Sequence, residues 1–194
     1  MLGDGNIYRN KKFHAYQLRI AGHEKYDKEY LSFVKVLIEE LFDIEAYYKH
    51  HSDKSKKAMY ICTSKRKVCE FVESVGVPTG NKKTQNAGIP LWILEEKELM
   101  EACIRGLFDT DASLAKKTPK HPCPSIWYES AIPQLRENVS YCLNQLGFHP
   151  SKWTKTTSHG VLQLCLGRRE EVIRFSRTIG FNNKKHKNKL LGLP

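Results

Sequence analysis

Two aspartates, Asp4 and Asp111, stand in similar surroundings at widely separated points of the chain. Asp4 is followed by Gly5-Asn6-Ile7 and Asp111 by Ala112-Ser113-Leu114, in each case a small, a polar and an aliphatic residue. Carboxylates that a fold brings together form an anionic site that is costly until divalent cations fill it. Such cations activate water and stabilise a leaving oxygen, as hydrolysis of a phosphodiester requires. A fold that brings Asp4 and Asp111 together would therefore be able to hold such cations.

An internal repeat connects the two aspartates. Three further segments recur in the same order: Glu40-Leu41-Phe42 with Leu146-Gly147-Phe148, Phe71 to Val77 with Phe175 to Phe181, and Asn81-Lys82-Lys83 with Asn183-Lys184-Lys185. The separation between matches drifts only from 107 residues (111 − 4) to 102 residues (183 − 81). Conserved order and nearly constant spacing predict one structural unit that is present twice.

Each copy is expected to alternate strands and helices. In the first copy, residues 7–10, 13–21, 44–51 and 57–63 have strand patterns, and helices are expected after Asp27 and Ser64 as caps. In the second copy, residues 124–131 and 161–166 predict strands, and helices are expected from Pro133 and Arg168. A further helix is expected over 95–108. Its Gly106 indicates either the close approach of another backbone or a tolerated defect.

The composition favours a soluble globular protein that binds polyanions. Hydrophobic residues make up 40% and charged residues 27% of the chain, and no apolar run approaches the roughly 20 residues that span a bilayer. The 32 Lys and Arg against 21 Asp and Glu give a net charge of +11, which favours salt-dependent binding to nucleic acid. The N-terminus does not resemble a signal peptide, so a cytoplasmic location without membrane contact is expected. The six cysteines lack zinc-site spacing and predict buried free thiols.

The stretch Ile104-Arg105-Gly106-Leu107-Phe108-Asp109-Thr110-Asp111-Ala112 resembles the second motif of the LAGLIDADG homing endonucleases. Leu2-Gly3-Asp4-Gly5-Asn6-Ile7 is similar to the end of the first motif, and the resemblance covers essentially the whole chain. It implies an α+β fold of two pseudo-symmetric αββαββα units, whose curved antiparallel sheets form a DNA-binding saddle. The first repeat is expected over residues 1–77 with its N-terminal helix truncated, a linker over 78–94, and the second repeat over 95–194.

The resemblance implies a site-specific endonuclease, encoded within an intron or intein, that makes a metal-dependent double-strand cut in a long DNA target. In the family the last acidic residue of each motif lies just beyond the C-terminus of a helix, which assigns Asp4 and Asp111. They are expected to hold Mg²⁺, or another divalent cation such as Mn²⁺, together with Gly3 and Thr110. The negative ends of the two helices would add to the anionic character of the pocket.

Family enzymes also carry a lysine near each site, and the repeated Asn-Lys-Lys assigns Lys82, Lys83, Lys184 and Lys185 to this place. They would stabilise the charged transition state or position water; phosphate anchoring is the alternative, and a solvated charge run is a third interpretation of residues 184–189. Each sheet is expected to contact the DNA major groove. The polar candidates for base contacts, each with a solvated strand face as the alternative, are Gln17, Arg19, Lys57, Glu129, Lys152 and Gln163.

Ala112 departs from the family pattern, because it replaces the final glycine of the motif and would be strained at a positive φ. The expected partner is double-stranded DNA, with intron RNA as a further candidate. A monomer is expected, with dimer formation through the 95–108 helix as the alternative. The alternative function is nucleic-acid binding without cleavage, by an RNA-splicing maturase or a DNA-binding regulator of the same fold.

Overall fold

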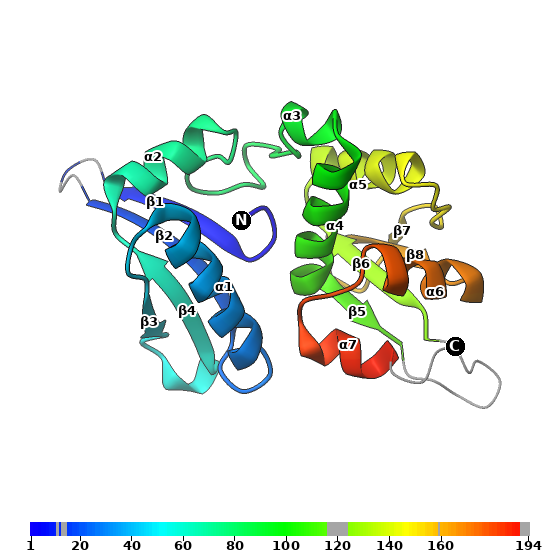
Figure 1. Cartoon of the computed structure of the whole chain (residues 1–194), viewed down its shortest axis with the longest axis horizontal. Helices are drawn as coiled ribbons and strands as arrows, with labels where there is room; N and C mark the ends of the chain where they lie inside the picture. The colour runs from blue at the N-terminus through cyan, green and yellow to red at the C-terminus, as the bar shows by residue number, and fades with distance from the viewer. Residues whose placement is uncertain (11, 13–14, 116–123, 159, 191–194) are drawn as a thin grey trace. The chain divides into compact units, whose positions relative to one another are not determined.

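The chain folds into two compact units (Figure 1). The computed structural model describes residues 1–10, 12, 15–115, 124–158 and 160–190. The first unit covers Met1–Gln85 and the second Asn86–Pro194, so the division falls within the segment 78–94 that was expected to be a linker. Each unit has one four-stranded antiparallel sheet with helices packed on it, which confirms the predicted α+β class.

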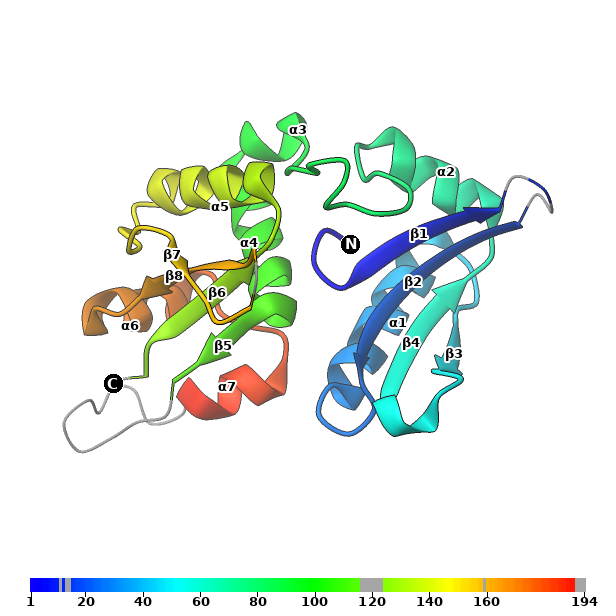
Figure 2. The ribbon, with the colours of Figure 1, turned by 180° about the vertical axis from the view of Figure 1, so that it is seen from behind.

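The first unit has the element order ββαββα. Its elements are β1 (Gly5–Asn10), β2 (Ala15–His23), α1 (Lys28–Phe42), β3 (Tyr47–His50), the short 3₁₀ helix η1 (Lys54–Lys56), β4 (Ala58–Thr63) and α2 (Arg66–Ser74). The strands lie in the order β1-β2-β4-β3, and Figure 2 shows the face of the sheet opposite α1. The four strand segments predicted for this unit are thus confirmed, with boundaries that differ by a few residues.

Alternation along β2 places its side chains as the sequence predicts. Tyr16, Leu18 and Ile20 are buried in one core with residues of α1 and α2, whereas Gln17 and Arg19 are less buried and point to the other face. The sheet therefore has a core face under the helices and an open face that is free of them.

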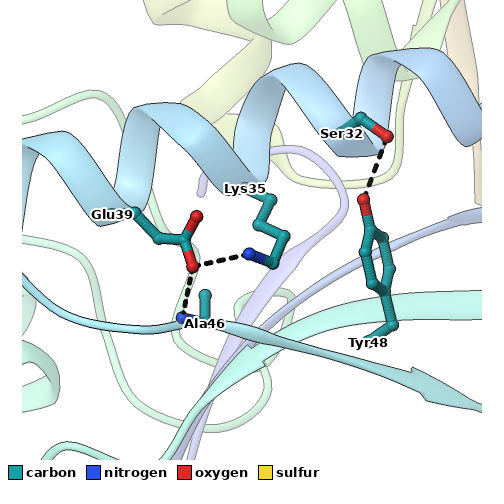
Figure 3. Close-up of polar contacts among 5 residues, drawn as sticks. All are labelled: Ser32, Lys35, Glu39, Ala46 and Tyr48. Carbon is teal, nitrogen blue, oxygen red and sulfur yellow. Dashed lines mark hydrogen bonds and ion pairs between the residues drawn. The ribbon is translucent and has the colours of Figure 1, made fainter.

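Polar contacts hold the edge strand β3 against α1 (Figure 3). Glu39 on α1 accepts hydrogen bonds from Lys35 Nζ at 2.6 Å and from the main-chain N–H of Ala46 at 2.9 Å. The hydroxyls of Ser32 and Tyr48 lie 2.9 Å apart. All four residues of β3 are exposed, so these contacts fix a strand that has little burial of its own.

The second unit has the full order αββαββα that the resemblance implies, preceded by a short helix and followed by another. Its elements are α3 (Leu91–Leu94), α4 (Lys97–Asp111), β5 (Ala112–Leu114), β6 (Ile126–Ser130), α5 (Pro133–Gln145), β7 (Thr154–Lys155), β8 (Leu162–Leu166), α6 (Arg169–Thr178) and α7 (Lys184–Leu190). The strand order β5-β6-β8-β7 repeats that of the first unit. The two units are therefore copies of one topology.

An aromatic cluster joins α4, β6 and α6 in the core of the second unit. The Phe108 ring stacks on Tyr128 with centroids 4.8 Å apart and lies 5.2 Å from Phe175. All three side chains are fully buried. Burial of three large rings contributes strongly to the stability of this core.

Several local predictions need correction. Helix α4 runs on to Asp111 instead of ending near Phe108, and the N-cap of α2 is Lys65, not Ser64. Asp27 is the N-cap of α1, but its carboxylate accepts the main-chain N–H of His23 instead of an N–H of the helix. Pro133 is at the start of α5, as predicted.

Gly106 has open space beside it within its own unit. A Cβ atom built on this glycine meets no heavy atom of the described residues there within 4 Å, apart from the nearby backbone of its own helix. Of the two interpretations of Gly106, the close approach of another backbone is therefore not found inside the second unit.

The described cysteines are free thiols, as expected. Cys62, Cys69 and Cys142 are buried, and Cys103 and Cys165 are partly buried. Burial raises the pKa of Cys103 to about 12 and that of Cys142 to about 11, so both stay neutral near pH 7. Cys123 lies outside the described residues. In the part of the chain that the structure describes, no helix combines the length and the apolar composition needed to cross a bilayer.

Candidate nucleic-acid interface and metal site

Asp4 and Asp111 occupy the same place in the two copies of the fold. Asp4 directly precedes β1 and Asp111 directly precedes β5, and these two strands have the same position in sheets of the same order. The backbone of Asp4 is tied to the sheet because its carbonyl accepts the N–H of Ala21 at 3.1 Å. Topology therefore supports the sequence match between the two aspartates.

Asp111 is the last residue of α4, not a residue beyond the helix end as the resemblance implied. It is partly buried, and its Oδ2 accepts a hydrogen bond from Thr110 Oγ1 at 2.9 Å. The Thr110 hydroxyl also lies 3.0 Å from the Leu107 carbonyl. The C-terminal carbonyls of a helix carry partial negative charge, so this carboxylate stands where the potential is already negative. A site of oxygen donors with this charge suits Mg²⁺ or Mn²⁺.

The electrostatic influence of Asp111 reaches Tyr128. The pKa of Tyr128 is raised well above its ordinary value, first by burial and then by the charge of Asp111. The Tyr128 hydroxyl is buried and has no hydrogen-bond partner among the described residues. A neutral phenol therefore lies close enough to sense the carboxylate charge.

Asp109 has a structural role that the sequence reading missed. It is fully buried, and its Oδ1 accepts the main-chain N–H groups of Asn182 at 2.8 Å and Asn183 at 2.9 Å. Burial raises the pKa of Asp109, although these two hydrogen bonds oppose the shift. The spacing in the sequence could have indicated this role, because side chains two residues apart on a helix point about 200° apart. Asp109 and Asp111 therefore could not serve the same site.

The repeated Asn-Lys-Lys forms the same local turn in both units. Asn81 Oδ1 accepts the N–H of Lys83 at 2.9 Å, and Asn183 Oδ1 accepts the N–H of Lys185 at 3.1 Å. An asparagine side chain commonly stabilises a turn in this way. Lys83 and Lys184 are exposed, whereas Lys82 and Lys185 are partly buried.

Lys82 lies against the segment that precedes Asp4. Its Nζ donates to the carbonyl oxygens of Met1 at 3.1 Å and Leu2 at 2.7 Å, and also to that of Gly3. The Gly3 carbonyl, which was assigned to the metal, is thus already in contact with a cationic group. The three carbonyl oxygens point to one positively charged group, so they form an arrangement that binds a cation.

Gly5 is required by a tight fold of the chain around Asp4. A Cβ atom at Gly5 would lie 2.5 Å from Met1 Cα and 2.7 Å from the Met1 carbonyl oxygen. The matching residue of the second unit, Ala112, has an extended backbone with φ −90° and ψ 154°. The strain considered for an alanine at this position is therefore absent.

The open face of the first sheet carries polar and aromatic side chains. Gln17 Nε2 donates to the Tyr47 hydroxyl at 3.2 Å, and the Arg19 guanidinium lies 5.6 Å from the centroid of the Tyr60 ring. By strand register, this face includes Asn6, Tyr8, Gln17, Arg19, Tyr47, Lys49, Tyr60 and Cys62. Lys57 is not part of it, because it lies directly before β4 in a left-handed conformation, with φ 46°.

The open face of the second sheet includes Glu129 and Gln163, which are directly opposite each other on β6 and β8. Trp127 and Cys165 are the next such pair on this face. Lys152 is exposed but lies before β7, outside the strands. Four of the six candidates for DNA contact thus lie on open sheet faces, and Lys57 and Lys152 lie beside them.

Within the described residues, no group of three or more His, Cys, Asp and Glu side chains is placed to hold a metal ion. Each unit on its own thus presents one candidate aspartate with oxygen atoms around it.

Part of the second unit is similar to a known protein family. The family model of the LAGLIDADG-like domain matches residues 98–180. No curated protein matches the chain.

Solved structures of homing endonucleases share the fold over nearly the whole chain. A mesophilic variant of the homing endonuclease I-DmoI is 22% identical, with 92% of this chain and 89% of that chain covered and a TM-score of 0.64. I-DmoI in complex with DNA and Ca is 20% identical, with 92% and 83% covered and a TM-score of 0.65. The meganuclease I-SmaMI bound to uncleaveable DNA is 11% identical, with 97% and 84% covered and a TM-score of 0.60.

Proposed function

We propose that this chain is a site-specific endonuclease that makes a metal-dependent double-strand cut in a long DNA target, because residues 98–180 match the LAGLIDADG-like domain and the chain has the fold of single-chain homing endonucleases. The observation that carries the proposal is the equivalence of Asp4 and Asp111, each placed directly before the first strand of its sheet. A nuclease that uses one carboxylate from each unit needs the two carboxylates at equivalent positions of the two units.

Asp4 and Asp111 would hold the divalent cations, with the carbonyl oxygen of Thr110 beside Asp111. The carbonyl oxygen of Gly3, beside Asp4, is in contact with the Lys82 ammonium. When bound, Mg²⁺ or Mn²⁺ supplies charge stabilisation at the phosphate and at the leaving oxygen. The partial negative charge at the C-terminus of α4 adds to the charge of the Asp111 carboxylate, and a bound cation would offset both. The exposed Lys83 and Lys184 are suited to contact DNA phosphates.

The open sheet faces would read the target sequence. Arg19 and Gln17 suit guanine and adenine edges, and Glu129 and Gln163 offer acceptor and amide groups on the second sheet. The net charge of +11 would attract the DNA backbone. A long target follows from two units that each carry a separate reading face.

A second candidate function is binding of intron RNA without DNA cleavage. It is favoured by the exposed Tyr8 and Tyr47, which share the open face of the first sheet with Arg19. Aromatic rings on an open sheet suit stacking with unpaired bases.

The test begins with selection of a binding site from a random duplex library by the purified protein with Ca²⁺. The selected duplex is then placed in a supercoiled plasmid and incubated with Mg²⁺ or with EDTA. The proposal expects linear product with Mg²⁺ only. Selective binding of the duplex without any cut would show a DNA-binding protein that does not cleave. Preference for a single-stranded or structured RNA competitor would favour RNA binding, the second candidate function.

A further inference from the structure

The ammonium group of Lys82 donates hydrogen bonds to the backbone immediately before Asp4. It contacts the carbonyl oxygens of Met1 and Leu2 at 3.1 and 2.7 Å, and that of Gly3. A lysine ammonium has three N–H donors and no acceptor, so it can serve several carbonyl oxygens at once. Hydrogen bonds from a charged donor are stronger than neutral ones, and the partial burial of Lys82 limits competition from water.

A second observation shows that this segment is closely folded. The missing side chain of Gly5 leaves the space in which the backbone of Met1 lies, since a Cβ atom there would be 2.5 Å from Met1 Cα. Residues 1–5 thus form a compact turn around the Lys82 ammonium. Asp4 is part of this turn, so its position depends on the contacts that hold the turn together.

In the second unit, a negatively charged side chain makes the link between the motif and the Asn-Lys-Lys turn, whereas in the first unit the linking side chain is positively charged. The residue two positions before the candidate metal ligand is Asp109 in the second unit and Leu2 in the first. The Asp109 carboxylate accepts the main-chain N–H groups of Asn182, just before the Asn-Lys-Lys turn, and of Asn183, its first residue. Leucine cannot do this. In the first unit the link runs in the other direction, from the side chain of Lys82 in the Asn-Lys-Lys turn to carbonyls of the motif.

We propose that Lys82 is a positioning residue that acts as a built-in cation, fixing the turn that carries Asp4 before a divalent cation binds. The inference rests on the proposed function in that it takes Asp4 as the metal-binding aspartate of the first unit. It also separates the roles of two neighbouring lysines. The donors of Lys82 are directed at carbonyl oxygens, whereas exposed Lys83 is the one suited to a phosphate.

The test compares Lys82→Met, Lys82→Arg and the matched neighbour Lys83→Met in the full chain, without DNA. Amide hydrogen exchange of residues 1–10 is measured first, in EDTA. Lys82→Met should exchange about tenfold faster or more in this segment, because a local contact of the folded state is lost. Lys83→Met should match the wild type, and Lys82→Arg should fall between them because it keeps cationic donors.

Thermal melting with and without Mn²⁺ gives a second readout. In Lys82→Met the vacated carbonyls are open to a metal cation, so Mn²⁺ should raise the melting temperature more than in the wild type and should slow the exchange of residues 1–10 again. In Lys83→Met the response to Mn²⁺ should equal that of the wild type. Should Lys82→Met not fold, the comparison of Lys82→Arg with Lys83→Met decides by the same exchange measurement.

Equal exchange in the Lys82 and Lys83 variants would overturn the positioning role. So would a Lys82→Met variant that loses only cleavage, with unchanged exchange and melting, because that pattern belongs to a group that acts on the substrate. Neither readout needs a cleavable target. A wild-type protein that does not cut DNA would therefore defeat the proposed function and leave the role of Lys82 to be decided separately.

Discussion

Asp109 and Asn183 hold each other through reciprocal hydrogen bonds between the end of α4 and the start of α7. Asp109 Oδ1 accepts the main-chain N–H of Asn183 at 2.9 Å, and Asn183 Nδ2 donates to the Asp109 carbonyl at 3.2 Å. Both residues are buried, and Asp109 Oδ2 has no hydrogen-bond partner among the described residues. The pair fixes the Asn-Lys-Lys turn of the second unit relative to the helix that carries Asp111.

Asp109→Asn should make the stability of the protein less dependent on pH. Burial raises the pKa of Asp109 in the folded state, so the folded protein binds this proton more tightly than the unfolded chain. The contribution of Asp109 to stability is therefore full at low pH and decreases as the pH rises above about 4, toward the folded pKa. The amide keeps the acceptor for both N–H groups and cannot ionise.

The measurement is urea unfolding of the wild type and Asp109→Asn between pH 4 and pH 8. The difference in unfolding free energy should shift in favour of the variant as the pH rises. A difference that stays constant over this range, or that shifts toward the wild type, contradicts the account of Asp109.

Tyr128→Phe should leave the protein as stable as the wild type or more stable by about 1 kcal/mol, because it removes a buried hydroxyl that has no partner among the described residues. The ring keeps its stacking on Phe108. The control is Tyr48→Phe, which removes the contact with Ser32 Oγ and should cost about 0.5–1.5 kcal/mol. Urea unfolding at pH 7 compares the two. A loss of more than about 1 kcal/mol in Tyr128→Phe would show that its hydroxyl is hydrogen-bonded after all.

Gly5→Ala should destabilise the first unit by about 1–3 kcal/mol, since the new methyl group would overlap backbone atoms of Met1 and force residues 1–5 to shift. Gly167→Ala is the matched control, because a Cβ atom there has only ordinary contacts of 3.5 and 3.8 Å. Denaturant unfolding measures the loss of stability, and hydrogen exchange of residues 1–10 in the folded protein shows whether the loss is located there. Equal stability of the two variants would show that residues 1–5 are not closely folded around Asp4.

Arg19→Ala should weaken binding to the selected duplex by about 1–3 kcal/mol if the guanidinium contacts a base edge, and should relax specificity at one target position. Arg19 is an exposed charge on the open face of the first sheet. Arg177→Ala, on α6, removes the same charge from a helix and should change binding little. Fluorescence titrations over a range of salt concentrations measure both. Equal affinities of the two variants would exclude a base contact by Arg19.

The sequence was sufficient to predict features that depend on local pattern. Alternation along β2 placed Leu18 and Ile20 in the core and Gln17 and Arg19 on the open face, because successive strand residues point in opposite directions. Pro133 marked the start of α5 for a similar reason, since its fixed φ suits the first turn of a helix. The matching positions of Asp4 and Asp111 followed from the repeat alone.

Features that depend on tertiary contacts were not predicted. Strands β5 and β7 have three and two residues, too short for a periodic pattern, and exist because β6 and β8 offer them hydrogen-bonding edges. The roles of Asp109 and Lys82 arise from contacts more than 70 residues away in sequence. A charged residue inside a motif does not reveal by its type whether it serves the fold or the chemistry.

The central claim is that one aspartate from each unit serves in cleavage, and plasmid nicking by Asp4→Asn and Asp111→Asn tests it most directly. Asp43→Asn is the control, because Asp43 is an exposed residue at the end of α1 whose left-handed conformation asparagine also adopts readily. With Mg²⁺ and the selected target, we expect both site variants to bind the duplex and to cut it at least about 100-fold more slowly than the wild type and Asp43→Asn. Cleavage at the wild-type rate by either Asp4→Asn or Asp111→Asn would contradict the account.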